Sequence, residues 1–322
     1  MSIPEERLKR FFLFGNAAGF SIIAFASYFD VYSHRTIFVG TDPWYNPAHI
    51  ILYSGFVVLL LTVLKLLNHR DGVIKLSIIG ILISIVAAGF NEFWHRVLLY
   101  GNPLPEPFPI EPPHALLAVG FIVSGVAALI YPFKNPEIVS DNRARIAVSF
   151  LSGSLWLIVA GSAFFVGGVV TTRGAILFAI ATASFSASLF LSYPAAFTKK
   201  FGFATLSYLW YFGVNFLFFL SPSDGFPIGI FLVAGLDYLL VEQFATHAAT
   251  LRNIVLVMIA ALYGLIYFPL LPIVDTFVFN NSVALILLGA SCAGVLIEFF
   301  VVKFFAKSLT RPTAEISLPE IG

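Results

Sequence analysis

The sequence has few charged residues and only one cysteine. Charged residues make up 11% of the 322 residues and hydrophobic residues 59%, a balance that excludes an ordinary soluble globular protein. The formal net charge of +1 lacks the basic excess typical of nucleic-acid binding, so nucleic acid is not an expected partner. Cys292 stands alone, which excludes an intrachain disulfide. The chain also lacks a phosphate-binding glycine loop, G-x-S-x-G, H-E-x-x-H and any cysteine pair, so nucleotide hydrolysis and cysteine-ligated metals find no support.

Long apolar runs dominate what remains. Ten of them reach the length needed to cross about 30 Å of hydrocarbon. They fall at 11–32, 47–68, 74–99, 113–132, 146–171, 174–195, 201–221, 226–246, 253–275 and 281–306. The sequence therefore predicts an all-α polytopic membrane protein with about ten transmembrane helices, surrounded by the lipid bilayer.

The basic residues predict the orientation of these helices, because Lys and Arg accumulate on the cytoplasmic side. Of the 18 basic residues, all but Arg35, Arg96 and Arg173 fall at the chain ends or in the connections after even-numbered helices. We therefore expect a multi-pass protein of the cell membrane with both termini in the cytoplasm.

The segment 133–145, rich in proline and charge, is the expected boundary between two units. The prediction is a four-helix metal-binding unit at 1–135, a six-helix unit at 136–312 and a short C-terminal tail at 313–322. The connection is short for a linker, so the two units are expected to pack together.

Candidate metal ligands gather at the predicted outer ends of the first two helices. Asp30 and His34 are four residues apart, which places them on one face of a helix. His49 follows Pro47 at the start of the next helix, so a short connection brings it near the other two. A carboxylate and two imidazoles leave an open coordination position, as in catalytic metal sites.

The next two helices repeat this arrangement with Asn91, His95 and His114. Asn is a poorer ligand than Asp, so a metal should bind more weakly here, or depend on Glu92 or water. Glu92 points about 100° round the helix from Asn91. The alternative is a hydrogen-bonded cap or ion pair at each helix end. Four of the six histidines occupy matching places in the two copies, which favours a metal at the first site and leaves both interpretations open at the second. The ligands suit copper, zinc and iron alike.

This double motif resembles the C subunit of the copper membrane monooxygenases, the particulate methane and ammonia monooxygenase family. The likeness lies in D-x-x-x-H, a loop containing T-D, P-x-H, then N-E-x-x-H and P-H, within roughly the first 130 residues. It implies one copper site at Asp30, His34 and His49 and a second at Asn91, His95 and His114. It also implies partner subunits and electrons from the quinol pool. The longer loop after His95 and the six further helices depart from that subunit.

Three functions follow as hypotheses. The first is an oxidoreductase, a copper-dependent monooxygenase subunit or a diverged relative, in which Asp30, His34 and His49 form the catalytic site for oxidation of a small apolar substrate by dioxygen. The second is a membrane transporter or metal-handling protein that uses intramembrane carboxylates such as Asp237 and Glu242. The simpler interpretation of these carboxylates is hydrogen bonding to nearby hydroxyls. The third is a zinc-dependent membrane hydrolase.

Overall fold

The fold is known from a computed structural model that describes residues 5–37, 46–67, 71–94, 112–139, 141–169 and 200–218, with a few separate positions. The part of the chain so described contains helices and no strand. Its elements are α1 (Glu5–Thr36), α2 (Pro47–Leu64), α3 (Gly72–Phe93), α4 (Pro112–Lys134), the 3-10 helix η2 (Pro136–Val139), α5 (Asn142–Val169) and α7 (Phe203–Phe218). The prediction of an all-α protein is confirmed for these residues.

Within the described residues, four helices are long and apolar enough to cross a membrane. They cover Glu5–Ser33, Pro47–Leu64, Gly72–Phe93 and Pro112–Pro132, and they correspond to the first four predicted spans. In the described residues α7 is a shorter apolar helix. The predicted spans at 174–195, 226–246, 253–275 and 281–306 lie wholly or mainly outside the described residues, as does the tail at 313–322.

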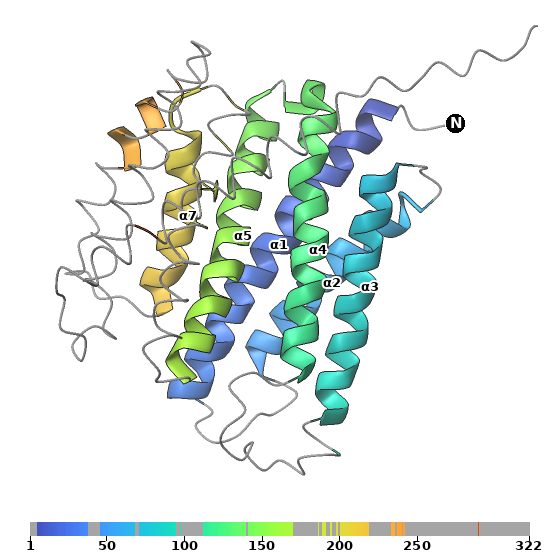
Figure 1. Cartoon of the computed structure of the whole chain (residues 1–322), viewed down its shortest axis with the longest axis vertical. Helices are drawn as coiled ribbons and strands as arrows, with labels where there is room; N and C mark the ends of the chain where they lie inside the picture. Colours follow the sequence, from blue (N-terminus) through green and yellow to red (C-terminus); the bar gives the residue numbers. More distant parts are fainter. Residues whose placement is uncertain are drawn as a thin grey trace, which may run out of the picture.

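The first four helices form two antiparallel hairpins, α1 with α2 and α3 with α4 (Figure 1). Facing glycines bring the helices of each pair close together, as in other membrane helix pairs. A Cβ on Gly19 would lie 3.3 Å from the carbonyl oxygen of Gly55, and one on Gly55 3.1 Å from that of Gly19. In the second hairpin, Gly80 and Gly120 face each other in the same way, at 2.7 and 2.8 Å. Larger residues would push the helices apart.

The two hairpins are repeats of one another in register as well as in shape. The first glycine of each pair lies eleven residues before the Asp or Asn of its motif, and the second lies six residues after the last His. Phe56 and Phe121, each seven residues after that His, stack on each other with ring centroids 5.3 Å apart. The contacts of α1 with α4 and of α2 with α3 are also equal in extent. The two hairpins therefore place corresponding residues at corresponding helix positions, and the Phe56 and Phe121 rings meet where the hairpins pack together.

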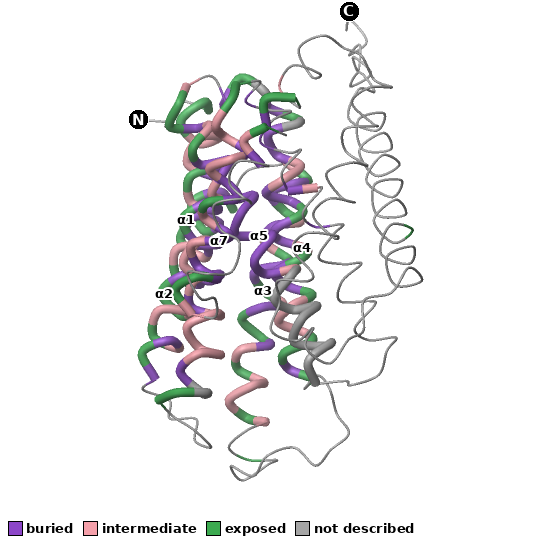
Figure 2. Tube along the Cα trace, turned by 90° about the vertical axis from the view of Figure 1, so that its left-hand side faces the viewer, coloured by how far each residue is buried: buried purple, intermediate pink, exposed green. Residues whose placement is uncertain are grey.

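Helix α1 is the shared element of the bundle, because it packs against α2 on one side and α5 on another, and α5 packs against α7. Ser21 of α1 hydrogen-bonds Ser154 of α5 between their Oγ atoms at 3.0 Å, and the Tyr28 hydroxyl donates to the Leu157 carbonyl oxygen at 3.2 Å. Residues 151–158 of α5 are all buried (Figure 2). The core thus runs from the first hairpin into the second predicted unit.

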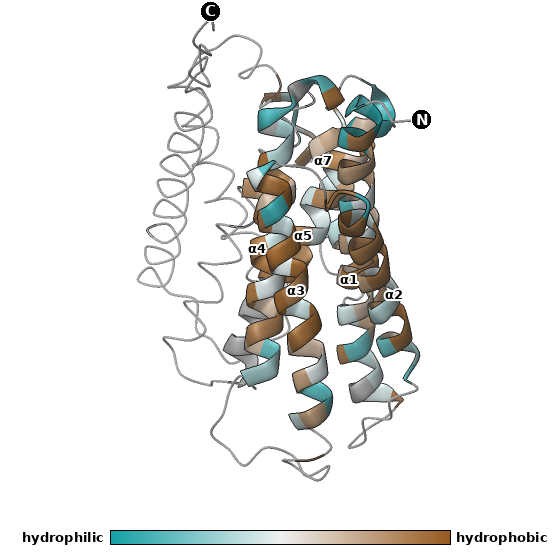
Figure 3. Ribbon diagram, turned by 90° about the vertical axis from the view of Figure 1, so that its right-hand side faces the viewer, coloured by the Kyte–Doolittle hydropathy of each residue, from teal (hydrophilic) through white to brown (hydrophobic). Residues whose placement is uncertain are grey.

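The outward surface of α2 is apolar (Figure 3). Ile50, Val57, Leu61 and Leu64 are exposed and follow one another at helical spacing. An apolar stripe of this kind is unfavourable in water, and lipid accommodates it. The surface therefore agrees with a location in a membrane.

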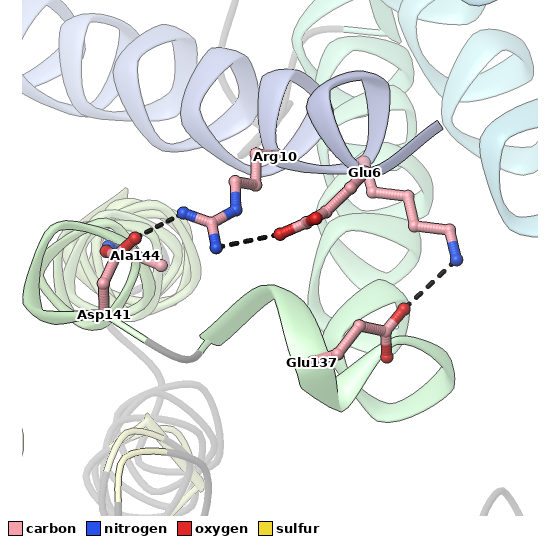
Figure 4. Close-up of polar contacts among 6 residues, drawn as sticks. Glu6, Arg10, Glu137, Asp141 and Ala144 are labelled. Carbon is pink, nitrogen blue, oxygen red and sulfur yellow. Dashed lines mark hydrogen bonds and ion pairs between the residues drawn. The ribbon is translucent and has the colours of Figure 1, made fainter. Parts of the chain in front are cut away.

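The end of the bundle where α1 begins carries an ion-pair network (Figure 4). Arg10 of α1 bonds Glu6 at 3.0 Å and also bonds Asp141, just before α5. The Ala144 backbone N–H donates to the other Asp141 carboxylate oxygen at 2.8 Å. The Ala144 N–H and the Arg10 guanidinium hold the pKa of Asp141 below its ordinary value of 3.8 and outweigh partial desolvation. Asp141 is therefore charged at neutral pH and binds α5 to α1.

The same network reaches the predicted unit boundary at 133–145. Lys9 Nζ lies 3.1 Å from Glu137 Oε1, in the 3-10 helix Pro136–Val139. Since both partners are partly exposed, the pair contributes at most about 1 kcal/mol. Its consequence is geometric, because it holds the start of α1 against this connection.

Candidate metal centre

Asp30 and His49 meet at the end of the bundle where α1 and α3 finish and α2 and α4 begin, called here the histidine end (bottom of Figure 1). Asp30 lies near the end of α1 and His49 in the first turn of α2. His49 Nε2 is 3.1 Å from Asp30 Oδ1, and the two side chains are 12% and 27% exposed. The structure thus brings together two of the three residues of the first predicted site.

Asn46, which the sequence interpretation did not single out, organises this pair. Its side chain is buried; Nδ2 donates to Ser33 Oγ at 2.9 Å and to Asp30 Oδ1 at 3.3 Å. Its Oδ1 accepts the Ala48 backbone N–H at 3.0 Å, which caps α2. The signal was an Asn directly before a Pro at a helix start, an N-cap followed by proline in the first turn.

His34 belongs to the helical part of α1, one turn beyond Asp30, and its side chain lies outside the described residues. Among the side chains that are described, no three His, Cys, Asp or Glu residues gather in one group. The three-ligand set of Asp30, His34 and His49 therefore stays a prediction.

The second motif is placed only in part. Asn91 lies near the end of α3, and its Oδ1 is buried with no hydrogen-bond partner among the described residues. His114 lies in the first turn of α4 and is exposed. His95 lies outside the described residues. A second metal site at these three residues is thus also a prediction, although the repeat relation gives Asn91 and His114 the places of Asp30 and His49.

Glu92 faces the first hairpin. Its Oε1 accepts a hydrogen bond from the Tyr53 hydroxyl of α2 at 3.0 Å. The Tyr53 ring in turn lies 6.4 Å from the His49 ring, centroid to centroid, one turn along α2. The carboxylate that sequence reasoning considered for the second site is therefore bonded to the helix that carries His49.

The geometry of Asp30 and His49 fits a shared metal ion. Ligand bonds of about 2.0 to 2.2 Å in tetrahedral geometry place two ligand atoms about 3.3 to 3.6 Å apart, so the 3.1 Å between Oδ1 and Nε2 lies just below the lower value. The bond from Asn46 to the same carboxylate oxygen is the kind of outer contact that orients a metal-ligating carboxylate. A hydrogen bond between the two residues has the same length, which is the alternative set out from the sequence.

Asp237, one of the two carboxylates considered for transport, accepts hydrogen bonds from the start of α7. Asp237 is buried, and its Oδ2 accepts from the Gly202 and Thr205 backbone N–H groups, both at 2.9 Å, and from Thr205 Oγ1 at 2.8 Å. These donors belong to the start of α7, so Asp237 caps that helix from a distant segment. Glu242 lies outside the described residues.

Comparison of the chain with protein-family models, with curated proteins and with solved structures finds no match in any of the three. The function must therefore be inferred from the residues of the histidine end, from their contacts and from the repeat relation of the two hairpins.

Proposed function

We propose that this chain is a copper-binding membrane protein, a C-subunit-like component or diverged relative of a copper membrane monooxygenase that oxidises a small apolar substrate with dioxygen. The proposal includes ten membrane spans, cytoplasmic termini and an outward-facing histidine end. The observation that carries it is the 3.1 Å approach of Asp30 and His49 from two different helices. Its main support beyond that is the repetition of the motif in two hairpins that share one register.

Each residue of the first site has a distinct role in this proposal. Asp30, His34 and His49 hold the ion, and Asn46 orients the Asp30 carboxylate through its hydrogen bond. Bound copper would supply a redox-active centre that activates dioxygen. The apolar outward surface of α2 would let a hydrophobic substrate approach from the bilayer and would keep bulk water away from the ion.

Zinc is the second candidate, because a carboxylate with imidazoles at this spacing suits zinc equally well. A zinc-dependent hydrolase would need no reductant, whereas a copper monooxygenase would. The transport alternative draws less support, since Asp237 is already engaged as a helix cap.

The test is the metal content of protein purified from native membranes, by mass spectrometry together with electron paramagnetic resonance. The variants are His49→Ala and His34→Ala for the first site and His95→Ala for the second, with His69→Ala, in the connection between α2 and α3, as the matched control. We expect copper to be lost from the first two variants and retained in the control. Equal metal content in all four proteins, or no metal after copper-replete growth without chelators, would refute the site, and stoichiometric zinc would favour the hydrolase.

A further inference from the structure

The C-terminal end of α1, which carries Asp30, is held by aromatic contacts with the second predicted unit. Phe218, the last residue of α7, lies against three rings of α1. Its ring centroid is 5.3 Å from that of Phe25, 5.6 Å from Phe29 with the planes nearly parallel at 21°, and 5.6 Å from Tyr32. These distances are those of favourable aromatic pairs. We call these four rings the aromatic clamp.

The clamp and the candidate metal ligand lie on different faces of α1. Phe25, Phe29 and Tyr32 recur at spacings of four and three residues, which defines one stripe of the helix. Asp30 follows Phe29 by one residue and is therefore turned about 100° away from it, toward α2 and His49. The end of α1 is thus fixed between α7 on one face and α2 on another.

The second hairpin has the same stripe without the clamp. The repeat relation places Val86, Phe90 and Phe93 of α3 where α1 has its three rings. Val86 is 65% exposed and Phe93 49% exposed. Of the two equivalent helix ends in the described residues, only the one that carries Asp30 is held by such a ring.

We propose that Phe218 is a positioning residue for the Asp30 and His49 pair, and that one task of the second unit is to fix the end of α1 through the aromatic clamp. A metal site needs its ligand atoms held within about 0.5 Å of their working positions. A helix end that can tilt does not meet that requirement. Among the described residues, the clamp therefore gives the first hairpin preorganised ligands and has no counterpart on the second. The part of this inference that concerns metal affinity rests on the proposed function, whereas the part that concerns the position of α1 does not.

The experiment measures the position of α1 without any metal. Spin labels are placed at Ile37→Cys and Ile50→Cys, exposed positions just after α1 and in the first turns of α2, in a Cys292→Ser background. Pulsed dipolar spectroscopy on the full chain in lipid nanodiscs gives the distance distribution between the labels. We expect a single narrow distribution in the parent protein and a broadened or shifted one in Phe218→Ala.

Matched variants separate positioning from general loss of structure. Phe218→Tyr keeps the ring and should keep the narrow distribution. Phe216→Ala removes another ring of α7, which stacks on Phe212 and is not part of the clamp. This variant should also keep the narrow distance distribution. Because Phe218→Ala can reduce the yield of folded protein, Phe218→Leu provides a milder loss of the ring, for which we expect intermediate broadening.

Copper affinity is then measured in the same variants by competition with a calibrated chelator. We expect Phe218→Ala to weaken binding about 10- to 100-fold, the range for loss of groups that orient metal ligands, and Phe216→Ala to have no effect. An unchanged label distance in both Phe218→Ala and Phe218→Leu would overturn the positioning role whether or not copper binds. A broadened distance in a protein whose parent binds no copper would support the positioning of α1 and refute the proposed function instead.

Discussion

Replacement of Asn46 by Ala tests how the first site is built, because this buried side chain makes three hydrogen bonds. Loss of the cap on α2 should cost about 1 kcal/mol. Loss of the bonds to Ser33 Oγ and Asp30 Oδ1 should cost about 1 kcal/mol each, and the 3.3 Å length of the second puts it at the weak end of that range. We therefore expect Asn46→Ala to lower the free energy of unfolding by about 2 to 3 kcal/mol. If the site binds metal, its affinity should fall about 10- to 100-fold, since the Asp30 carboxylate loses the donor that orients it.

Two variants separate the cap from the orienting contact. Asn46→Ser keeps an N-cap acceptor and loses both amide donors, so it should be about 1 kcal/mol more stable than Asn46→Ala while binding metal just as weakly. Asp71→Ala removes the cap of α3, whose Oδ1 accepts the Val73 N–H at 2.7 Å, at the opposite end of the bundle. It should lower stability without any effect on the metal. The measurements are reversible unfolding in detergent micelles and chelator competition. If Asn46→Ala and Asp71→Ala weaken metal binding equally, Asn46 has no specific role in orienting Asp30.

Three further outcomes are expected. Gly80→Ala should lower the free energy of unfolding by about 1 to 3 kcal/mol, because the added Cβ collides with α4. Gly89→Ala, with open space around the added Cβ, should leave stability unchanged or slightly raise it. Equal melting temperatures of the two variants would contradict the close glycine contact. The pKa of Asp141 is lowered in the folded state, so its contribution to stability is present above its ordinary pKa and is lost as pH falls through the lower folded value. The melting temperature, measured over a series of pH values, should therefore fall more steeply on the acid side in the parent than in Asp141→Asn. Parallel curves would show that the Asp141 carboxylate does not contribute to the pH dependence of stability. Asn91→Asp gives the second motif the carboxylate of the first, so it should tighten metal binding at the second motif. If metal titration finds no change in affinity there, in a protein whose first site binds metal, the equivalence of the two hairpins is contradicted.

The positions of the first four helices could be predicted from the sequence alone. A run of about 20 apolar residues has few alternatives to a membrane-spanning helix, because the backbone polar groups must be satisfied within the segment. The structure accordingly places α2 at Pro47–Leu64 and α4 at Pro112–Lys134, close to the predicted 47–68 and 113–132. Asn46 as the N-cap and Pro47 in the first turn of α2 fix that boundary locally. The ten-helix count and the unit boundaries beyond these helices stay predictions.

Of the histidine end, the sequence by itself determined which residues share a helix face, because the spacing of Asp30 and His34 depends only on the period of an α-helix. It also indicated that His49 would lie near them, since a short connection leaves two neighbouring helix ends no room to separate. Only the tertiary structure decided the rest. Asn46 bridges Asp30 and Ser33, Tyr53 binds Glu92, and Phe218 supports α1 from 186 or more residues further along the chain. Contacts of this kind depend on how far each helix is rotated and how closely the helices approach, and these are set by the packing of whole helix faces, which no local pattern of residues encodes.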